Sequence, residues 1–400
     1  MGTKGLEGTF APNKQRAIHR WFAYMEGYSE ALVERELELI GYDRIHTLYD
    51  PFAGSGTSLL TASQHNIAPY YSEINPVMRF VCDAKINAVK RIKESPQKQE
   101  MLKAHYRQIE QAHISARGIN DYQGFEKFYT LDRLSVLLQL LRIIDSIPDD
   151  DVKNVCRVAL AAITTQVSNM VRRGDLRYAK GNEKAKVNQD VQAVYLEKLR
   201  QIQEDIADSE ITLYAGATKI SEDSRDNESI DLFDCVVTSP PYLNGTNYIR
   251  NTKLELKLLG FIDSEADLPP LHSRGIIAGI NSVSRRNKVE VLPVVQPYFD
   301  KLTPAAYDKR IPVIVAGYFY DMEKVILKLH RSIKPNGYFI MDIGDSVFSG
   351  IHIPTHELLE QIAAAHGFKK YGEEILRIRH SNDGTKLTQR VLRFTNAKEQ

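Results

Sequence analysis

The sequence predicts an α/β protein built on a doubly wound, mostly parallel sheet. Short apolar runs alternate with segments of helical periodicity along the chain, a pattern typical of such sheets. A turn containing Gly54 and Gly56 joins the first run to a helix, and two prolines after Ser239 end a later run abruptly. Because ligands collect at the carboxyl ends of parallel strands, both turns are expected to open into one cleft.

Each element is predicted from a local pattern. The run "LFDCVV" before Thr238 predicts a buried strand, which Pro240 and Pro241 end because they lack the amide hydrogens that a ladder needs. The segment "DRLSVLLQLLRIIDSI" has apolar residues at helical spacing. The expected order is a loop and helix over 10–40, a strand, turn and helix over 44–66, a strand over 68–76, mostly helix over 84–208, strands over 210–220 and 232–238, and helix, strand, helix and two strands over 318–396.

Two stretches fit the core pattern poorly and are interpreted as insertions. One is helical, and the other is rich in Pro, Gly, Asn and Ser, which indicates a loop-rich segment. The expected division is 1–83 (first part of the core, with the glycine turn), 84–208 (helical insertion), 209–260 (core with the Pro-Pro loop), 261–312 (loop-rich insertion) and 313–400 (last part of the core).

Composition excludes several classes of protein. The 52 basic and 51 acidic residues nearly cancel, so any binding to nucleic acid has to come from local patches. Cys82, Cys156 and Cys235 are far apart and fit neither a disulfide framework nor a zinc site. They favour a cytoplasmic protein without a metal. We find no signal peptide, and no apolar run reaches the roughly 18 residues of a membrane span.

The glycine turn "DPFAGSGT", residues 50–57, favours a nucleoside ligand. Gly54 and Gly56 allow backbone angles closed to other residues and let a ligand approach the main chain. A P-loop would need Lys before Thr57, and a dinucleotide turn would need a third glycine further on. Glu73 follows the next expected strand, where a carboxylate binds ribose hydroxyls in doubly wound folds.

The motif "DPFAGSGT" followed by "TSPPY" resembles the S-adenosylmethionine-dependent amino-methyltransferases that methylate exocyclic amines of DNA bases. The resemblance covers residues 10–80, 210–260 and 318–396 and implies a Rossmann-like methyltransferase fold. The first motif would then bind the cofactor and the second would be the catalytic loop. The residues expected to bind S-adenosylmethionine are Asn13, Lys14, Asp50, Pro51, Phe52, Ala53, Gly54, Gly56, Thr57, Glu73, Asn75 and Thr238. The expected catalytic residues are Ser239, Pro240, Pro241 and Tyr242.

The chemistry of such a reaction fits the catalytic loop. The amino group of a base is a weak nucleophile, because its lone pair is delocalised into the ring. Acceptors such as the Ser239 hydroxyl and the Pro240 carbonyl can localise that pair, in directions that the two prolines fix beforehand. Tyr242 offers an aromatic face to an extruded base, and such stacking contributes roughly 1–3 kcal/mol.

The first residue of the loop bears on the target base. Ser at position 239 is typical of cytosine-N4 enzymes in this family, whereas Asp or Asn is typical of enzymes acting on adenine N6, RNA or protein glutamine. Cytosine N4 is therefore expected, with an adenine-N6 or an RNA methyltransferase as the alternatives. A protein-glutamine methyltransferase and a non-catalytic partner subunit also stay open. Cytosine-C5 chemistry needs a cysteine nucleophile after a proline, and Cys235 lies within a strand.

Double-stranded DNA is the partner that the resemblance implies, in a restriction–modification or defence role with a cognate endonuclease encoded nearby. Basic loops beside the cleft are candidates for phosphate and guanine contacts. They are "NMVRRGDLRYAKG", expected at the end of a long helix, and "NSVSRRNK" in the second insertion. The segment "YAGAT", residues 214–218, occupies the position where the family often has an acidic contact to the cofactor's adenine. No acid stands there, and the nearby backbone can serve instead. The nucleic-acid candidates are Arg172, Arg173, Arg177, Lys180, Asn244, Tyr248, Arg250, Arg285 and Arg286.

Overall fold

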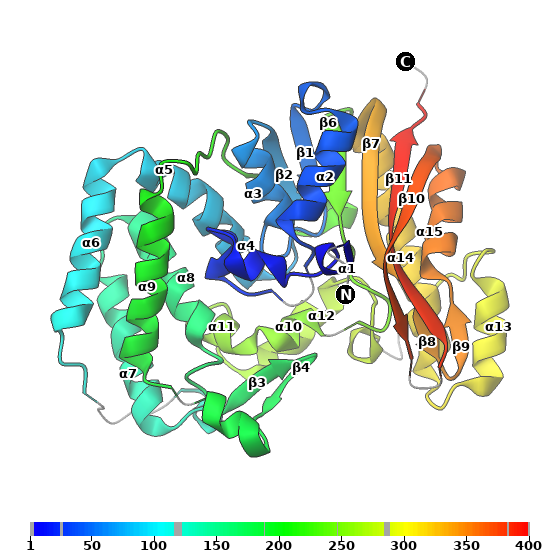
Figure 1. The fold of residues 1–400 in the computed structure, drawn as a ribbon. Coiled ribbons are helices and arrows are strands. Elements are labelled where there is room, and N and C mark those ends of the chain that lie inside the picture. Colours follow the sequence, from blue (N-terminus) through cyan, green and yellow to red (C-terminus); the bar gives the residue numbers. More distant parts are fainter. Residues whose placement is uncertain are drawn as a thin grey trace.

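A seven-stranded sheet forms the centre of the molecule, with the strand order β10-β11-β7-β6-β1-β2-β5 (Figure 1). The computed structural model describes residues 4–24, 27–115, 122–187, 189–245, 247–283, 289–381 and 384–398. The strands are β1 (Thr47–Asp50), β2 (Ala68–Ser72), β5 (Thr218–Ser221), β6 (Phe233–Thr238), β7 (Ile333–Gly344), β10 (Phe368–His380) and β11 (Lys386–Asn396). The five strands from β7 to β5 pair in parallel, and β11 and β10 add an antiparallel edge. The predicted fold class is confirmed.

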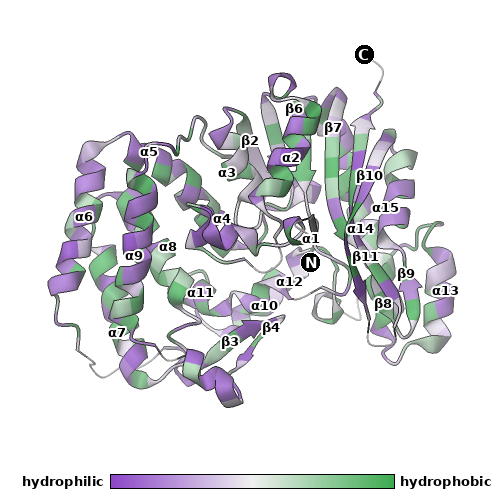
Figure 2. Ribbon diagram, viewed as in Figure 1, coloured by the Kyte–Doolittle hydropathy of each residue, from purple (hydrophilic) through white to green (hydrophobic). Residues whose placement is uncertain are grey.

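Helices cover both faces of this sheet, because successive residues of its strands point in opposite directions. On β6, Val236 packs in the cluster of α14 (Arg310–Ser332) and α15 (Thr355–Ala365). Its neighbours Cys235 and Val237 pack on the other face with α2 (Glu30–Ile40). A strand that is buried on both sides carries a continuous apolar run, which is why "LFDCVV" could be identified. Figure 2 shows hydrophobic residues along the strands and a largely hydrophilic α6.

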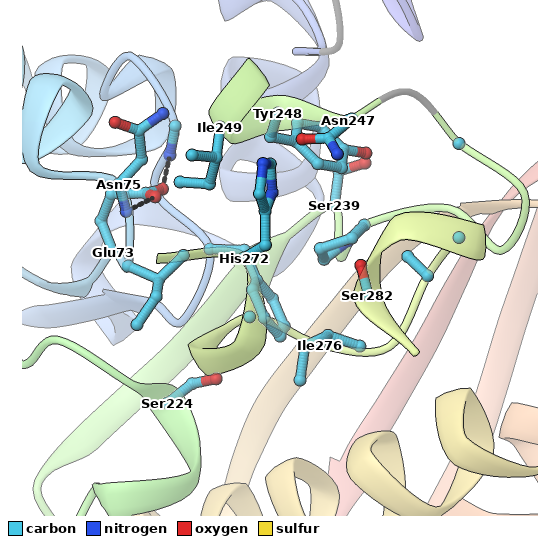
Figure 3. A pocket seen from close by; sticks show the side chains of 18 of the residues that line it. Glu73, Asn75, Ser224, Ser239, Asn247, Tyr248, Ile249, His272, Ile276 and Ser282 are labelled. Carbon is cyan, nitrogen blue, oxygen red and sulfur yellow. Dashed lines mark hydrogen bonds between the residues drawn. The ribbon is translucent and has the colours of Figure 1, made fainter. Parts of the chain in front are cut away.

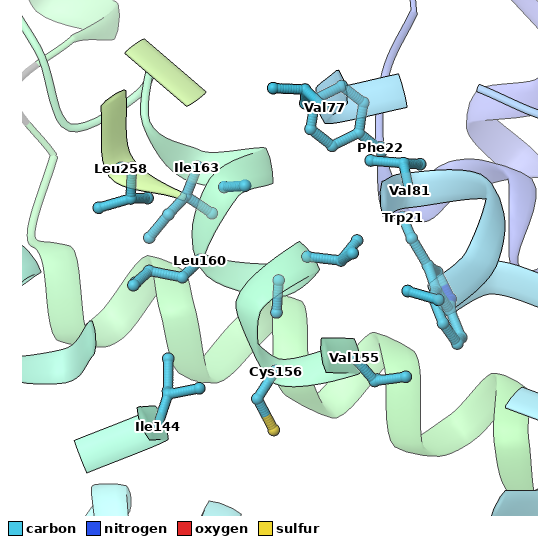
Figure 4. Packing of buried hydrophobic residues seen from close by; sticks show 14 of the residues in the cluster. Trp21, Phe22, Val77, Val81, Ile144, Val155, Cys156, Leu160, Ile163 and Leu258 are labelled. Carbon is cyan, nitrogen blue, oxygen red and sulfur yellow. The ribbon is translucent and has the colours of Figure 1, made fainter. Parts of the chain in front are cut away.

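The helical insertion packs directly onto the core. Helix α4 (Pro76–Asp83) continues through a π-helical turn at Ala84–Ala88 into α5 (Val89–Lys93). Trp21 and Val81 lie in one hydrophobic cluster with Val155 and Leu160 of the insertion (Figure 4). The insertion is therefore continuous with the core around the glycine turn. Its remaining helices are α6 (Pro96–Gln111), α7 (Leu131–Asp145), α8 (Asp150–Ile163) and α9 (Val191–Ala207).

One expected helix end is a β-hairpin. Helix α8 stops at Ile163, and β3 (Met170–Arg173) pairs antiparallel with β4 (Asp175–Tyr178). Gly174 makes the turn with φ +72°, a value that favours glycine. The pattern of buried Met170 and Leu176 among polar residues has the period of a strand, which the prediction of a basic loop missed.

The second insertion contains more helix than its composition indicated. Helices α12 (Leu268–Arg274) and α13 (Gln296–Ala305) lie within it, and α14 begins at Arg310. Both α12 and α13 carry proline in the first turn, where the missing N–H costs nothing. These prolines suggested loops but start helices. No described helix is long and apolar enough to span a membrane.

Candidate active site

A cavity of about 340 Å³ is lined by both the glycine turn and the Pro-Pro loop. Gly54 follows β1 and Ser239 follows β6, and these two strands are neighbours in the sheet. Figure 3 shows Glu73 and Asn75 on one side of the cavity and Ser239 on the other. The two motifs thus face one space of a size that suits a small organic ligand.

Most residues expected to bind the cofactor line this cavity, and four do not. Those that line it are Asp50, Pro51, Phe52, Ala53, Gly54, Thr57, Glu73 and Asn75. Those that do not are Asn13, Lys14, Gly56 and Thr238. Of the expected catalytic residues, Ser239 and Pro241 line it, Tyr242 lines a second cavity, and Pro240 lines neither of the two.

Asp50 ends β1 with its carboxylate buried among protein donors. Oδ1 accepts hydrogen bonds from Thr238 Oγ1 (2.7 Å) and Phe52 N (3.0 Å). Oδ2 accepts from Tyr28 OH (3.1 Å) and from Ser58 Oγ. Burial raises the pKa of Asp50, although these bonds oppose the rise. The carboxylate therefore joins the end of β1 to the end of β6, and Thr238 contacts Asp50 and not the cavity.

Glu73 supports the main chain of the glycine turn. Its Oε2 accepts a hydrogen bond from Gly54 N (2.7 Å), and its Oε1 accepts from Asn75 N (2.8 Å). Burial raises the pKa of Glu73 to about 7. Each carboxylate oxygen has a second lone pair for a ligand hydroxyl. Asn75 caps α4 by accepting from Val77 N (3.0 Å), so it shapes the wall at this point.

Two side chains hold the glycine turn from behind. Cys82 Sγ donates to Gly54 O (3.3 Å), and Lys85 Nζ donates to Ser55 O (2.8 Å). Both side chains are fully buried, and burial lowers the pKa of Lys85 to about 8. A Cβ on Gly56, whose φ is +80°, would lie 3.0 Å from Cys82 Sγ. The turn is therefore fixed by residues outside its own motif, which sequence reasoning missed.

Asn13 belongs to this same layer behind the turn and not to the cavity wall. Its Nδ2 donates to Thr57 Oγ1 (3.3 Å) and to Tyr28 O (3.1 Å), and its Oδ1 accepts from Glu30 N (2.8 Å). Asn13 thus joins the amino-terminal segment to the first residue of α3 (Thr57–Gln64). Lys14 is exposed outside the cavity.

An acidic stretch that follows β5 lines the cavity. The strand β5 begins at Thr218 and ends at Ser221, so residues 214–218 do not lie at its carboxyl end. Glu222, Asp223 and Ser224 follow directly and line the cavity. A polar group at the carboxyl end of β5 is where a ligand is expected in such a sheet.

The Pro-Pro loop shares a buried carboxylate on β7. Tyr242 OH donates to Asp342 Oδ2 (3.0 Å), and Gln389 Nε2 donates to both carboxylate oxygens (3.0 Å each). Burial raises the pKa of Asp342 to about 7, opposed by hydrogen bonds from Gln389, Tyr242 and Ser239. The Tyr242 ring lies against Gly344, where a Cβ would meet it at 3.0 Å. Asp342 was missed, although an acid inside the apolar run "YFIMDIG" was a visible signal.

A second cavity, of about 430 Å³, lies beyond the Pro-Pro loop. Tyr242 and Arg379 line it, and Asn244 and Gly245 line both cavities. The loop therefore separates the two spaces. Asp345 also lines the second cavity, and its hydrogen bonds with His356 and Thr388 help to lower its pKa to about 2.

The residues expected to bind nucleic acid fall into distinct groups. Asn244 and Tyr248 line the first cavity, and Arg250 is exposed on α10 (Tyr248–Asn251). Arg172 points inward, with Nη2 2.7 Å from Glu255 Oε1 and Nε donating to Asn251 O. Arg173, Arg177 and Lys180 lie on or beside the hairpin, where both arginines pair with Glu183. Arg285 and Arg286 lie outside the described residues.

Comparison with known proteins supports the resemblance seen in the motifs. No family model matches the chain. Type II methyltransferase M.AvaI of Nostoc sp. is 27% identical, covering 90% of this chain and 81% of that protein. M.BsoBI of Geobacillus stearothermophilus is 25% identical (95% and 84% covered), and M.MvaI of Kocuria varians is 24% identical (91% and 84% covered), both also type II methyltransferases. Among solved structures, the rRNA methyltransferase aviRa from Streptomyces viridochromogenes matches over 92% of the chain with 11% identity and a TM-score of 0.32. A similarity this low does not support a functional comparison. Over about nine-tenths of its length the chain is a relative of type II methyltransferases, as its two motifs predicted.

Proposed function

We propose that the protein is a sequence-specific DNA methyltransferase that uses S-adenosylmethionine to methylate the N4 amino group of an extruded cytosine. The observation that carries this proposal is the single cavity lined by Gly54 and Ser239. The naming of the relatives as type II methyltransferases supports it. Ser at position 239 favours cytosine N4 over adenine N6.

The first cavity fits the nucleoside part of the cofactor. The Glu73 carboxylate, beside the main chain of Gly54, would accept hydrogen bonds from the ribose hydroxyls, and residues 222–224 would lie at the adenine. Ribose donors favour the charged form of Glu73, whose pKa burial raises to about 7. Cofactor affinity is therefore expected to fall as the pH drops below about 7. When bound, the cofactor supplies an electrophilic methyl group on a sulfonium centre.

The second cavity would hold the extruded base. A base stacked on Tyr242 would present its amine to Ser239 Oγ, which lines the first cavity, and to the carbonyl of the next residue, Pro240. Ser239 can accept from the amine while its own hydroxyl donates to Asp342. The proton that the methylated amine has to lose can pass through Ser239 Oγ to the Asp342 carboxylate. The two residues thus hold the amine and then take its proton.

The biological setting follows from the same proposal. Double-stranded DNA is the substrate, and a cognate restriction endonuclease encoded nearby is the proposed partner. A cytoplasmic location stays a prediction. The DNA substrate and the endonuclease partner rest on the relatives being named type II methyltransferases. An endonuclease of the same sequence specificity that is encoded nearby, or that co-purifies with the protein, would support the proposed partner.

Nucleoside analysis by mass spectrometry tests the reaction. Duplex DNA and structured RNA are each incubated with the protein and S-adenosylmethionine, digested and analysed. The proposal expects N4-methylcytosine from the DNA. Detection of N6-methyladenine would change the proposed target from cytosine to adenine and would leave the proposed mechanism unchanged. Methylation of RNA alone, or of neither polymer, would overturn the proposal.

A further inference from the structure

The hairpin β3–β4 lies beside the catalytic centre although it belongs to the helical insertion. Figure 1 shows it next to α10, the short helix that follows the catalytic loop. Asp175, the first residue of β4, lines the same cavity as Gly54 and Ser239. An element far away in the sequence therefore reaches the mouth of the site.

Specific contacts fasten the hairpin at this place. Asn251 of α10 donates from Nδ2 to Gly174 O (2.7 Å) and accepts at Oδ1 from Leu176 N (2.8 Å). Arg172 Nη2 binds Glu255 of α11 (Lys253–Leu258) at 2.7 Å. These bonds hold both strands against the helices that continue from the catalytic loop. The tip of the hairpin is thus in fixed register with the site of methyl transfer.

The two faces of the hairpin differ sharply. Side chains alternate along each strand, so the inner face carries Met170 and Leu176, both buried, together with Arg172 and the exposed Tyr178. The outer face carries two pairs of opposite residues, Arg173 with Asp175 and Val171 with Arg177. Arg173 and Asp175 are exposed, and no described heavy atom outside the adjoining residues lies within 4 Å of a Cβ built on Gly174. The tip is therefore open to a ligand, and on the outer face Arg173 is exposed but pairs with Glu183 at 3.3 Å, a contact that a guanine would have to replace.

The chemistry of this outer face suits a groove of duplex DNA. A two-stranded ribbon fits the major groove, whose base edges present a distinct pattern of donors and acceptors. An exposed guanidinium can donate to guanine O6 and N7, and an exposed carboxylate can accept from a cytosine or adenine amine. Exposed Lys180, Lys184 and Lys186 follow β4 and are placed for phosphates. A purely electrostatic surface would gain nothing from an acid at its tip.

We propose that the hairpin β3–β4 is the element that reads the recognition sequence, with Arg173 and Asp175 contacting base edges in the major groove next to the extruded base. This inference rests on the proposed function, since it takes DNA as the substrate. The helical remainder of the insertion then acts as the support that positions the ribbon.

Methylation of a duplex library with a randomised recognition site tests the hairpin. The wild type, Asp175→Ala, Arg173→Ala and Arg107→Ala are compared by sequencing the methylated products. Arg107 is a matched control, because it is an exposed arginine of the same insertion with an acidic partner, Glu100. Each hairpin variant is expected to lose about 5- to 100-fold discrimination at one base pair, while affinity for S-adenosylhomocysteine stays that of the wild type.

The outcomes separate this inference from the function on which it rests. A wild type that methylates no duplex DNA overturns the proposed function itself. A wild type with a clear sequence preference that both hairpin variants retain overturns only the role of the hairpin. Because the two substituted side chains are exposed, a variant that fails to fold by circular dichroism would show them to be structural and would also overturn it.

Discussion

The glycine turn and the catalytic loop follow neighbouring strands but are held in different ways. Cys82 and Lys85 hold the turn on the side away from the cavity, because they donate hydrogen bonds to its carbonyl groups. The polar side chains of the loop, Ser239 and Tyr242, instead share the carboxylate of Asp342. The first arrangement fixes the backbone of the turn, and in the proposed mechanism the second accepts a proton. Substitutions on the two sides should therefore separate cofactor affinity from the rate of methyl transfer.

The largest effect is expected from Ser239→Ala. Removing the hydroxyl deprives the amine of an acceptor in the transition state, so kcat should fall about 10²- to 10³-fold. Affinity for S-adenosylhomocysteine, measured by isothermal titration, should stay within about twofold because the turn is untouched. Tritiated methyl transfer to duplex DNA gives kcat. Equal losses in kcat and in cofactor affinity would show that the glycine turn and the catalytic loop do not have separate roles.

Asp342→Asn should follow with a loss of about 100-fold in kcat. Burial raises the pKa of Asp342 to about 7, so the wild-type carboxylate is neutralised as the pH falls below about 7 and the rate should fall with it. The variant should lose this dependence in a kcat–pH profile. Asp345 cannot produce it, because its pKa is about 2. A profile that is the same in both proteins would contradict the role of Asp342.

Lys85→Met tests the other side of the comparison. The variant keeps the volume but frees Ser55 O, so affinity for S-adenosylhomocysteine should fall about tenfold, while kcat at saturating cofactor stays unchanged. Lys90→Met is the control, since Lys90 belongs to the next turn of the same continuous helix and pairs with Glu94. If Lys85→Met does not fold, Cys82→Ala should weaken binding in the same direction. A folded Lys85→Met variant with wild-type affinity for S-adenosylhomocysteine would show that Lys85 does not position the turn for binding.

The smallest effects concern two arginines near the mouth of the site. Arg250 is exposed, so Arg250→Ala should lower the slope of log K against log salt for DNA binding by about one. Arg172→Ala should leave that slope unchanged and lower Tm, because it leaves the buried Glu255 without its cation. Salt titrations and thermal melts distinguish the two. A smaller slope in Arg172→Ala would instead show that Arg172 contacts phosphate, as the sequence suggested.

Local patterns predicted the core well because each acted over a few residues. The alternation of buried runs and helices gave the parallel sheet, and the positions of Gly54 and Ser239 at strand ends placed them in one cleft. Glu73 was predicted at the cavity for the same reason. These inferences needed only the geometry of strands and turns.

Contacts between distant segments could not be predicted in this way. Lys85 and Cys82 were invisible as supports of the turn, because their partners are backbone carbonyls about thirty residues away. Arg172 looked like a free cation until Glu255 was placed beside it. Burial decides what a polar side chain does, and burial depends on the whole fold.

A crystal structure with sinefungin, an analogue that carries an amine in place of the methylsulfonium group, tests the central claim most directly. We expect the nucleoside of sinefungin to lie against Gly54 and Glu73 and its amine to point toward Ser239. A nucleoside bound elsewhere, or an amine directed away from the catalytic loop, would show that the two turns do not form one site of methyl transfer.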